Sequence, residues 1–152
     1  MVHIEIITDF LVEKKPRLSN FRAIIIFMNI FENLNPAQKE AVETLSGPML
    51  ILAGAGSGKT KTLTHRIANL IANGTPSEQI LAVTFTNKAA KEMRERLAEM
   101  LGANASDRFF MPWMGTFHGI CVRILRLRGE SVGVAKNFVI YDEDDRRKKK
   151  KK

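Results

Sequence analysis

The stretch that decides the fold of this chain is Leu50-Ile51-Leu52-Ala53-Gly54-Ala55-Gly56-Ser57-Gly58-Lys59-Thr60. The apolar residues 49–52 predict a short buried strand, a loop of small residues follows, and residues 61–73 predict an amphipathic helix. A strand, a glycine-rich loop ending in Lys-Thr and a helix are the context of a phosphate-binding P-loop. The sequence departs from the pattern G-x-x-x-x-G-K-[ST] at the first position, where it has Ala53 in place of glycine. We therefore expect no positive φ at this residue. The first functional prediction is therefore nucleotide binding.

The residue types in this loop suit a nucleotide triphosphate bound with Mg²⁺. Small side chains let successive backbone N–H groups surround phosphate oxygens, and the following helix directs the positive end of its dipole at the same anion. Lys59 adds a positive charge for the β- and γ-phosphates, and the Thr60 hydroxyl is a Mg²⁺ ligand, so these two are the predicted catalytic residues. The residues predicted to contact the nucleotide in this segment are Ala53, Gly54, Ala55, Gly56, Ser57, Gly58, Lys59, Thr60, Lys61 and Thr62. The alternative, a glycine-rich turn without a ligand, is disfavoured by the full strand–loop–helix context.

Composition and charge indicate one domain and give weak support for a nucleic-acid partner. The 152 residues suffice for a hydrophobic core, and the one cysteine, Cys121, excludes an internal disulfide and fits a reducing, cytoplasmic location. The net charge of +8 suggests nucleic acid, but residues 146–152 contribute seven of these charges, which leaves +1 on residues 1–145. We expect this basic tail to be disordered, because a block of like charge repels itself.

The first 27 residues do not fit the pattern that follows them. Residues 23–31 are strongly apolar but too short to span a bilayer, and no small-residue cleavage site follows them as a signal peptide requires. They are alternatively an extra strand or helix on the domain, or an exposed apolar segment. We prefer Met28 as the natural start, with residues 1–27 as an upstream extension.

Cap and turn residues divide the rest of the chain into helices and strands. A first helix opens at Asn35, with Pro36 at the first helical position and Gln38 completing a capping box. The alternative for Gln38 is an amide that contacts an adenine edge, and the cap is the favoured reading. Residues 75–78 predict a second capping box before a short helical turn. The later elements expected are strands at 80–85 and 109–114, the latter interrupted by Pro112, helices at 88–101 and 120–128, and a strand or extended turn at 137–141.

The alternation of strands and helices predicts an α/β fold with a parallel sheet. Ligands bind at the carboxyl ends of such strands, where Thr84-Phe85-Thr86-Asn87 lies, as the P-loop does. Phe85 is there either a core residue or a ring that stacks on an unstacked base. His118, near a helix start, is more typical of a cap or a packing residue than of a catalyst. The acidic residues 142–145 resemble a Walker B pair only weakly, because the apolar run before them is short.

Four segments, in order, resemble the motifs of the UvrD/Rep/PcrA family of superfamily 1 DNA helicases. They are residues 34–42 (Q motif), 53–60 (motif I), 84–93 (motif Ia) and 115–126 (motif Ib). The resemblance covers residues 28–145. Family members accept alanine at the position of Ala53, and they start a few residues before the Q motif, in agreement with Met28 as the start.

The resemblance implies part of a RecA-like P-loop NTPase fold, in which a parallel sheet is flanked by helices. Residues 28–129 would form the partial ATP-binding domain, and residues 130–145 would begin an inserted helical subdomain. ATP and Mg²⁺ would be the cofactors, and Gln38 would contact adenine while also capping its helix. Single-stranded DNA and duplex junctions would be the partners, with no membrane. The residues that would line the DNA track are Thr84, Phe85, Asn87, Thr116 and His118.

The family's chains are several times longer than this one. The Walker B Asp-Glu pair, the glutamine of motif III and the second RecA-like domain with its arginines are not among these 152 residues. The likeness breaks after Asp145 into the basic tail, for which a frameshifted or truncated gene is one interpretation and a nucleic-acid-binding tail the other. We expect a fragment of a 3′–5′ DNA helicase acting in DNA repair, which binds nucleotide weakly and hydrolyses little. Its incomplete sheet predicts poor solubility.

Two further function classes stay open at this stage. One is a module that binds nucleotide or single-stranded DNA without turnover, and the other is the helicase subunit of a helicase–nuclease complex, which shares these motifs. A P-loop kinase or GTPase is disfavoured, because the chain has no nucleoside-kinase lid and no guanine-reading Asn-Lys-x-Asp motif. Residues 87–90 read Asn-Lys-Ala-Ala instead.

Overall fold

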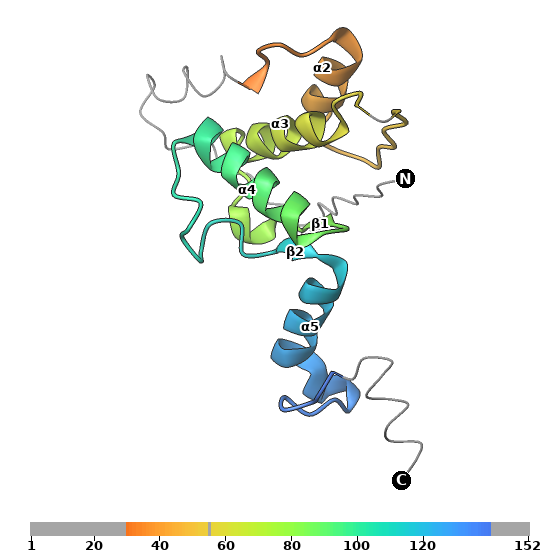
Figure 1. The fold of residues 1–152 in the computed structure, drawn as a ribbon, viewed down its shortest axis with the longest axis vertical. Coiled ribbons are helices and arrows are strands. Elements are labelled where there is room, and N and C mark those ends of the chain that lie inside the picture. Colours follow the sequence, from red (N-terminus) through yellow and green to blue (C-terminus); the bar gives the residue numbers. More distant parts are fainter. Residues whose placement is uncertain (1–29, 55, 141–152) are drawn as a thin grey trace. The chain divides into compact units, whose positions relative to one another are not determined.

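The computed structural model describes residues 30–54 and 56–140 (Figure 1). The elements are α2 (Pro36–Glu43), α3 (Lys59–Ala72), the 3₁₀ turn η1 (Ser77–Gln79), β1 (Ala82–Thr84), α4 (Asn87–Leu101), β2 (Met114–Thr116), α5 (Phe117–Arg128) and the 3₁₀ turn η2 (Gly129–Val132). The chain divides into two compact units, residues 1–117 and 118–152, which are treated separately below. The predictions for residues 1–27, Met28, Ala55, the acidic run 142–145 and the basic tail lie outside the described residues.

The sheet of the first unit consists of β1 and β2, which pair in parallel. The register sets Ala82 opposite Met114, Val83 opposite Gly115 and Thr84 opposite Thr116. A parallel pair needs a long connection, and α4 supplies it, packing against both strands. The predicted α/β class is thus confirmed, although the strand expected over 80–85 shortens to three residues.

The prediction of a buried strand over residues 49–52 is wrong. These residues form no strand, and the side chains of Leu50 and Leu52 are 70% and 80% exposed. A strand is stabilised by ladder hydrogen bonds to a neighbour, and in the described part of the chain the sheet contains only β1 and β2. Of the apolar run before the loop, Ile51 is half-buried against the core, whereas Leu50 and Leu52 are exposed.

The strand expected over residues 109–114 is also wrong, except for its last residue, where β2 begins. Met111 has a positive φ of 50°, and Pro112 has no N–H to donate to a ladder. The chain therefore turns before it can pair. Residues 137–140 are the described part of the segment expected as a strand or an extended turn. They form no strand; the Phe138 N–H donates to the Ala135 carbonyl in a turn, and Val139 and Ile140 are exposed.

The helix predictions agree better with the structure. α3 starts at Lys59, two residues before the predicted start, and Asn73 caps it at the predicted end. α4 is capped by Thr86, whose hydroxyl accepts from the Ala89 N–H, and it ends at Gly102 with φ of 61°. The short turn after residue 75 forms as η1, but the capping box predicted for it is absent, because its cap is Pro76.

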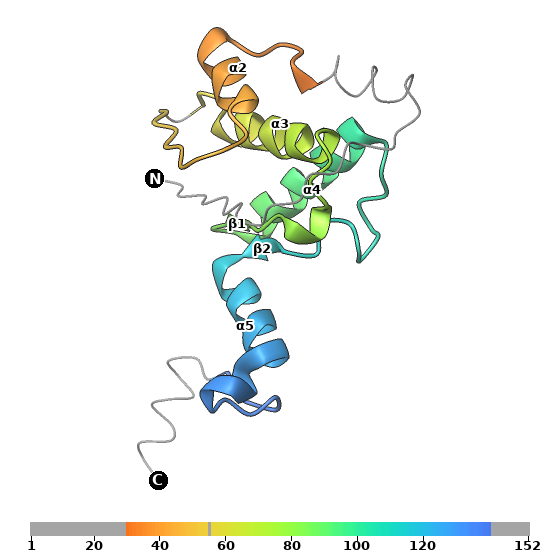
Figure 2. The same ribbon diagram turned by 180° about the vertical axis from the view of Figure 1, so that it is seen from behind.

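Helix α3 lies between α2 and α4, as both views show (Figures 1 and 2). Every residue from 62 to 70 is buried, including the predicted apolar positions Leu63, Ile67 and Leu70. Met93 and Leu97 of α4 are fully buried beside it, also as predicted. The core of the first unit is thus built around α3, whose first residue ends the glycine-rich loop.

The second unit contains α5 and η2. Ile124 and Leu127 of α5 are 44% and 57% exposed, so the helix covers little apolar surface within the described residues. After η2 the chain turns at Gly133, and an ion pair of 3.2 Å joins Lys136 to Glu130. Among the described residues, no helix is long and apolar enough to cross a membrane.

Candidate nucleotide-binding site

The described part of the loop before α3 contains two glycines in a left-handed conformation. Gly56 and Gly58 adopt positive φ values of 75° and 83°, which L side chains rarely adopt. The Ser57 hydroxyl donates to the Gly54 carbonyl at 2.7 Å and closes the turn between them. Ala53 has no positive φ, as the sequence predicts, so alanine is unstrained there. Glycine is needed at two loop positions and not at the first.

Lys59 directs its ammonium group back over the loop. Its Nζ donates to the Ala53 carbonyl at 2.8 Å and to the Gly54 carbonyl at 2.5 Å. Both acceptors are neutral dipoles, and no acidic side chain within residues 30–54 and 56–140 pairs with this ammonium group. The cation therefore lies where the loop turns, beside the start of α3.

Gln38 connects helix α2 to the same loop. Its Nε2 donates to the Ser57 carbonyl at 3.1 Å, and its Oε1 accepts from the Asn35 N–H at 3.0 Å. Asn35 Oδ1 in turn accepts from the Gln38 N–H at 2.8 Å, which completes the predicted capping box. A Cβ on Gly58 would lie 2.8 Å from Gln38 Nε2, so the amide lies directly against the loop backbone.

In the first turn of α3, two of the side chains predicted to contact the nucleotide already bond to backbone carbonyls of the protein. Thr62 is buried and donates its hydroxyl to the Gly58 carbonyl at 3.1 Å, and Lys61 Nζ donates to the Asn33 carbonyl at 2.6 Å. Thr60, the residue before Lys61, is half-buried. Because Gly58 gives α3 no side-chain cap, the first backbone N–H groups of the helix remain available to an anion.

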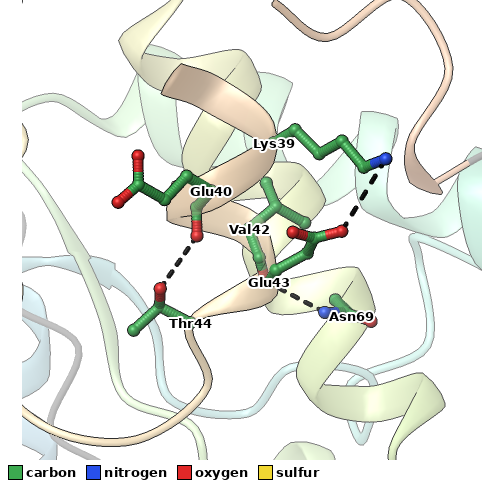
Figure 3. Close-up of polar contacts among 6 residues, drawn as sticks. All are labelled: Lys39, Glu40, Val42, Glu43, Thr44 and Asn69. Carbon is green, nitrogen blue, oxygen red and sulfur yellow. Dashed lines mark hydrogen bonds and ion pairs between the residues drawn. The ribbon is translucent and has the colours of Figure 1, made fainter. Parts of the chain in front are cut away.

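Four polar side chains of α3 bind backbone carbonyls of residues 30–42, and we name them the α3 donor stripe. The bonds run from Lys61 to Asn33, from His65 Nδ1 to Ile30 (2.5 Å), from Arg66 to Ala41 (2.7 Å) and from Asn69 to Val42 (2.9 Å, Figure 3). Burial lowers the pKa of the Arg66 guanidinium from its ordinary value through desolvation. The sequence reasoning missed this stripe. Its signal was the spacing of Lys61, His65 and Asn69 at every fourth residue.

The end of the sheet brings together four of the five predicted DNA-contact residues. Phe85 follows β1 and is 88% exposed, so the alternative of a core residue does not hold. Thr84 is buried, and its hydroxyl donates to the Thr86 carbonyl at 3.0 Å. Asn87 starts α4, and Thr116 pairs with Thr84 in the register. His118 belongs to the second unit, on the first turn of α5.

Arg94 of α4 fixes the segment that leads into β2. Its guanidinium donates to the Phe110 carbonyl and, at 3.0 Å, to the Met114 carbonyl. Two carbonyls on either side of Pro112 are thereby held by one planar group. The second of these carbonyls belongs to Met114, the first residue of β2.

The sequence model of the UvrD/REP helicase N-terminal domain matches residues 34–152, most of the chain. The chain belongs to the UvrD/REP helicase family. The match runs through the basic tail, whose assignment as a separate segment stays a prediction.

Relatives of this family member are identical to it at about half of the aligned positions. It is 52% identical over 117 residues to the ATP-dependent DNA helicase PcrA of Bacillus subtilis (strain 168), over 76% of this chain and 15% of the relative. The PcrA proteins of Staphylococcus epidermidis and Leuconostoc citreum are 50% and 53% identical over 119 and 115 residues, or 78% and 75% of this chain. The chain spans about one sixth of the length of these relatives.

The residues of this UvrD/REP helicase domain fit a bound triphosphate. The Lys59 cation, the uncapped start of α3 and the positive-φ glycines converge on one turn, and Gln38 borders it. The described residues offer fewer protein ligands for Mg²⁺ than for the phosphates. In residues 30–54 and 56–140, no three His, Cys, Asp or Glu side chains gather to hold a metal, so Thr60 would share Mg²⁺ with phosphate oxygens and water.

Proposed function

We propose that this chain forms the adenine- and phosphate-binding part of the ATP site of a DNA helicase. The observation that carries the proposal is the loop in which Lys59, α3 and Gln38 meet. It is supported by the family and by relatives named ATP-dependent DNA helicases. The RecA-like class of the fold is part of the proposal, as are 3′–5′ polarity, a role in DNA repair and a cytoplasmic location.

The proposed mechanism gives each residue a part in holding ATP. Lys59 exchanges the Ala53 and Gly54 carbonyls for the β- and γ-phosphates, and the first N–H groups of α3 donate to phosphate oxygens. Gln38 would present its amide to adenine, and Thr60 would hold Mg²⁺. Such an ion would supply positive charge that offsets the negative charge of the phosphates. These 152 residues contain no recognised Walker B pair, so we propose binding with negligible hydrolysis.

Titration of the chain with ATP and with inorganic tripolyphosphate, followed by NMR, tests the phosphate site. Lys59→Ala should weaken both ligands by about tenfold or more, because the site loses a charge aimed at the anion. Lys39→Ala is the matched control, since Lys39 is a half-exposed lysine whose ammonium lies 3.9 Å from Glu43. A chain that hydrolyses ATP when single-stranded DNA is added, and stops when Lys59 is replaced, contradicts the proposed lack of turnover.

We also propose that the exposed end of the sheet contacts single-stranded DNA. Phe85 is the most exposed of the large apolar side chains described, and a stacked base contributes about 1–3 kcal/mol by alanine substitution. Phe85→Ala should lower DNA affinity in a chain that lacks residues 146–152. Phe109→Ala, which also removes an exposed ring, is the control. Equal losses from both replacements would contradict a specific contact at Phe85.

The proposal extends to a DNA substrate and to a protein complex. Duplex junctions would be the physiological DNA, and a helicase–nuclease complex is a second setting in which the same domain would act. Binding to a forked duplex in preference to a single strand of the same length would support the junction.

A further inference from the structure

Helix α2 is attached to α3 at both of its ends. At the N-terminal end, Gln38 Nε2 donates to Ser57, just before α3 begins. At the C-terminal end, Arg66 and Asn69 donate to the carbonyls of Ala41 and Val42. An isolated helix of eight residues is unstable in water, so α2 depends on its contacts with α3, which include these hydrogen bonds and the burial of Val42.

The C-terminal attachment is a cap supplied by another helix. The last carbonyls of a helix have no partner within it and carry the negative end of the dipole. Arg66 brings a positive charge to that end, and Asn69 brings a neutral N–H; both donors are buried. Figure 3 shows the Asn69 amide reaching the Val42 carbonyl, while Thr44 bonds back to Glu40 within the same segment.

The N-terminal attachment leaves Gln38 with unused hydrogen-bonding capacity. An amide oxygen has two lone pairs and an amide NH₂ has two N–H groups, and Asn35 and Ser57 each use one. The remaining acceptor and donor match the N6 amine and N7 of adenine. Guanine presents an acceptor, O6, where adenine has its amine. The Gln38 amide therefore distinguishes adenine from guanine only while its oxygen and its NH₂ group are held opposite N6 and N7 of the base.

We propose that Asn69 and Arg66 are positioning residues that give the site its preference for adenine. They act through α2: by fixing its C-terminal end, they fix the direction from which Gln38 meets the base. The inference rests on the proposed ATP site and adds a determinant of its base selectivity. Neither residue touches the nucleotide, because both bond to carbonyls at the far end of α2 from Gln38.

The test compares ATP, GTP and tripolyphosphate binding to the 152-residue chain and its variants. Asn69→Ala should reduce the ratio of ATP to GTP affinity by roughly threefold or more, within the range of one hydrogen bond, and change tripolyphosphate affinity by less than about twofold. Thr44→Val is the matched control, because it removes the bond to Glu40 at the same helix end without detaching α2 from α3. It should leave the ratio unchanged.

A double-mutant cycle separates positioning from general damage. In a Gln38→Ala background, Asn69→Ala should have no further effect on the ratio, since it acts through Gln38. If Asn69→Ala does not fold, Arg66→Lys, which keeps the charge and loses the guanidinium, takes its place in the cycle. An unchanged ratio, or equal weakening of all three ligands, overturns the inference.

The inference and the proposed function fail in different ways. A wild-type chain that binds tripolyphosphate but does not prefer ATP to GTP overturns the positioning role and leaves the phosphate site intact. A wild-type chain that binds none of the three ligands overturns the proposed function and the inference with it.

Discussion

Replacing Gly58 by alanine tests the contact between the loop and Gln38. Gly58 has a φ of 83°, and its added Cβ would lie 2.8 Å from Gln38 Nε2. The left-handed backbone alone costs about 1–2 kcal/mol for an alanine. Because the clashing atom is the end of a flexible side chain, Gln38 would move away and lose its bond to Ser57, which adds about 0.5–1.5 kcal/mol.

Two neighbouring glycines make the controls. Gly56 also has a positive φ, of 75°, but a Cβ there would meet nothing within 4 Å, so Gly56→Ala should cost only the backbone term. Gly54 has neither a positive φ nor a close neighbour, so Gly54→Ala reports the unfolded-state effect common to all three. We expect Gly58→Ala to lower the free energy of unfolding by about 2–3 kcal/mol and Gly56→Ala by about 1–2 kcal/mol.

Urea unfolding followed by circular dichroism measures these differences. In a Gln38→Ala background the extra cost of Gly58→Ala over Gly56→Ala, about 1 kcal/mol, should disappear, because the clash and the bond are both gone. Equal costs for Gly56→Ala and Gly58→Ala in the wild-type background would refute the reasoning.

The remaining predictions concern the segments where sequence and structure differ or agree most clearly. Leu52→Lys should change the free energy of unfolding by less than about 0.5 kcal/mol, because its side chain is 80% exposed. A loss above about 2 kcal/mol would contradict this exposure and support the buried strand predicted from the sequence. Met93→Ala should cost about 2–5 kcal/mol, since the side chain is fully buried, and thermal unfolding measures it. Arg94→Met should cost about 1–3 kcal/mol by leaving the Phe110 and Met114 carbonyls without their donor, and Arg94→Lys, measured beside it in urea, should recover part of this.

The helices could be predicted because their signals are local. Asn35 and Gln38 form their capping box within one turn, and Gly102 ends α4 by its own backbone conformation. The strand over residues 49–52 could not be predicted correctly, since an apolar run becomes a strand only beside a partner, and pairing is not local. Pro112 correctly indicated that the strand before β2 would be interrupted, although the turn at Met111 was not predicted.

The sequence predicted the main residues of the candidate site, and the structure added the contacts that surround them. Lys59 and Gln38, which the family resemblance assigns to one ATP site, both contact the same loop. The contacts of His65, Arg66 and Asn69 were not predicted, because polar residues on a helix usually face solvent. Only the fold shows that each reaches a backbone carbonyl.

The α3 donor stripe also bears on how such a sequence can change over time. Its acceptors are main-chain carbonyls of residues 30, 33, 41 and 42, and every amino acid provides the same carbonyl. Its donors are side chains that few other amino acids reproduce in length and polarity. Substitutions at residues 30, 33, 41 and 42 therefore leave these acceptors in place so long as the backbone keeps its path, whereas substitutions at Lys61, His65, Arg66 or Asn69 remove a donor.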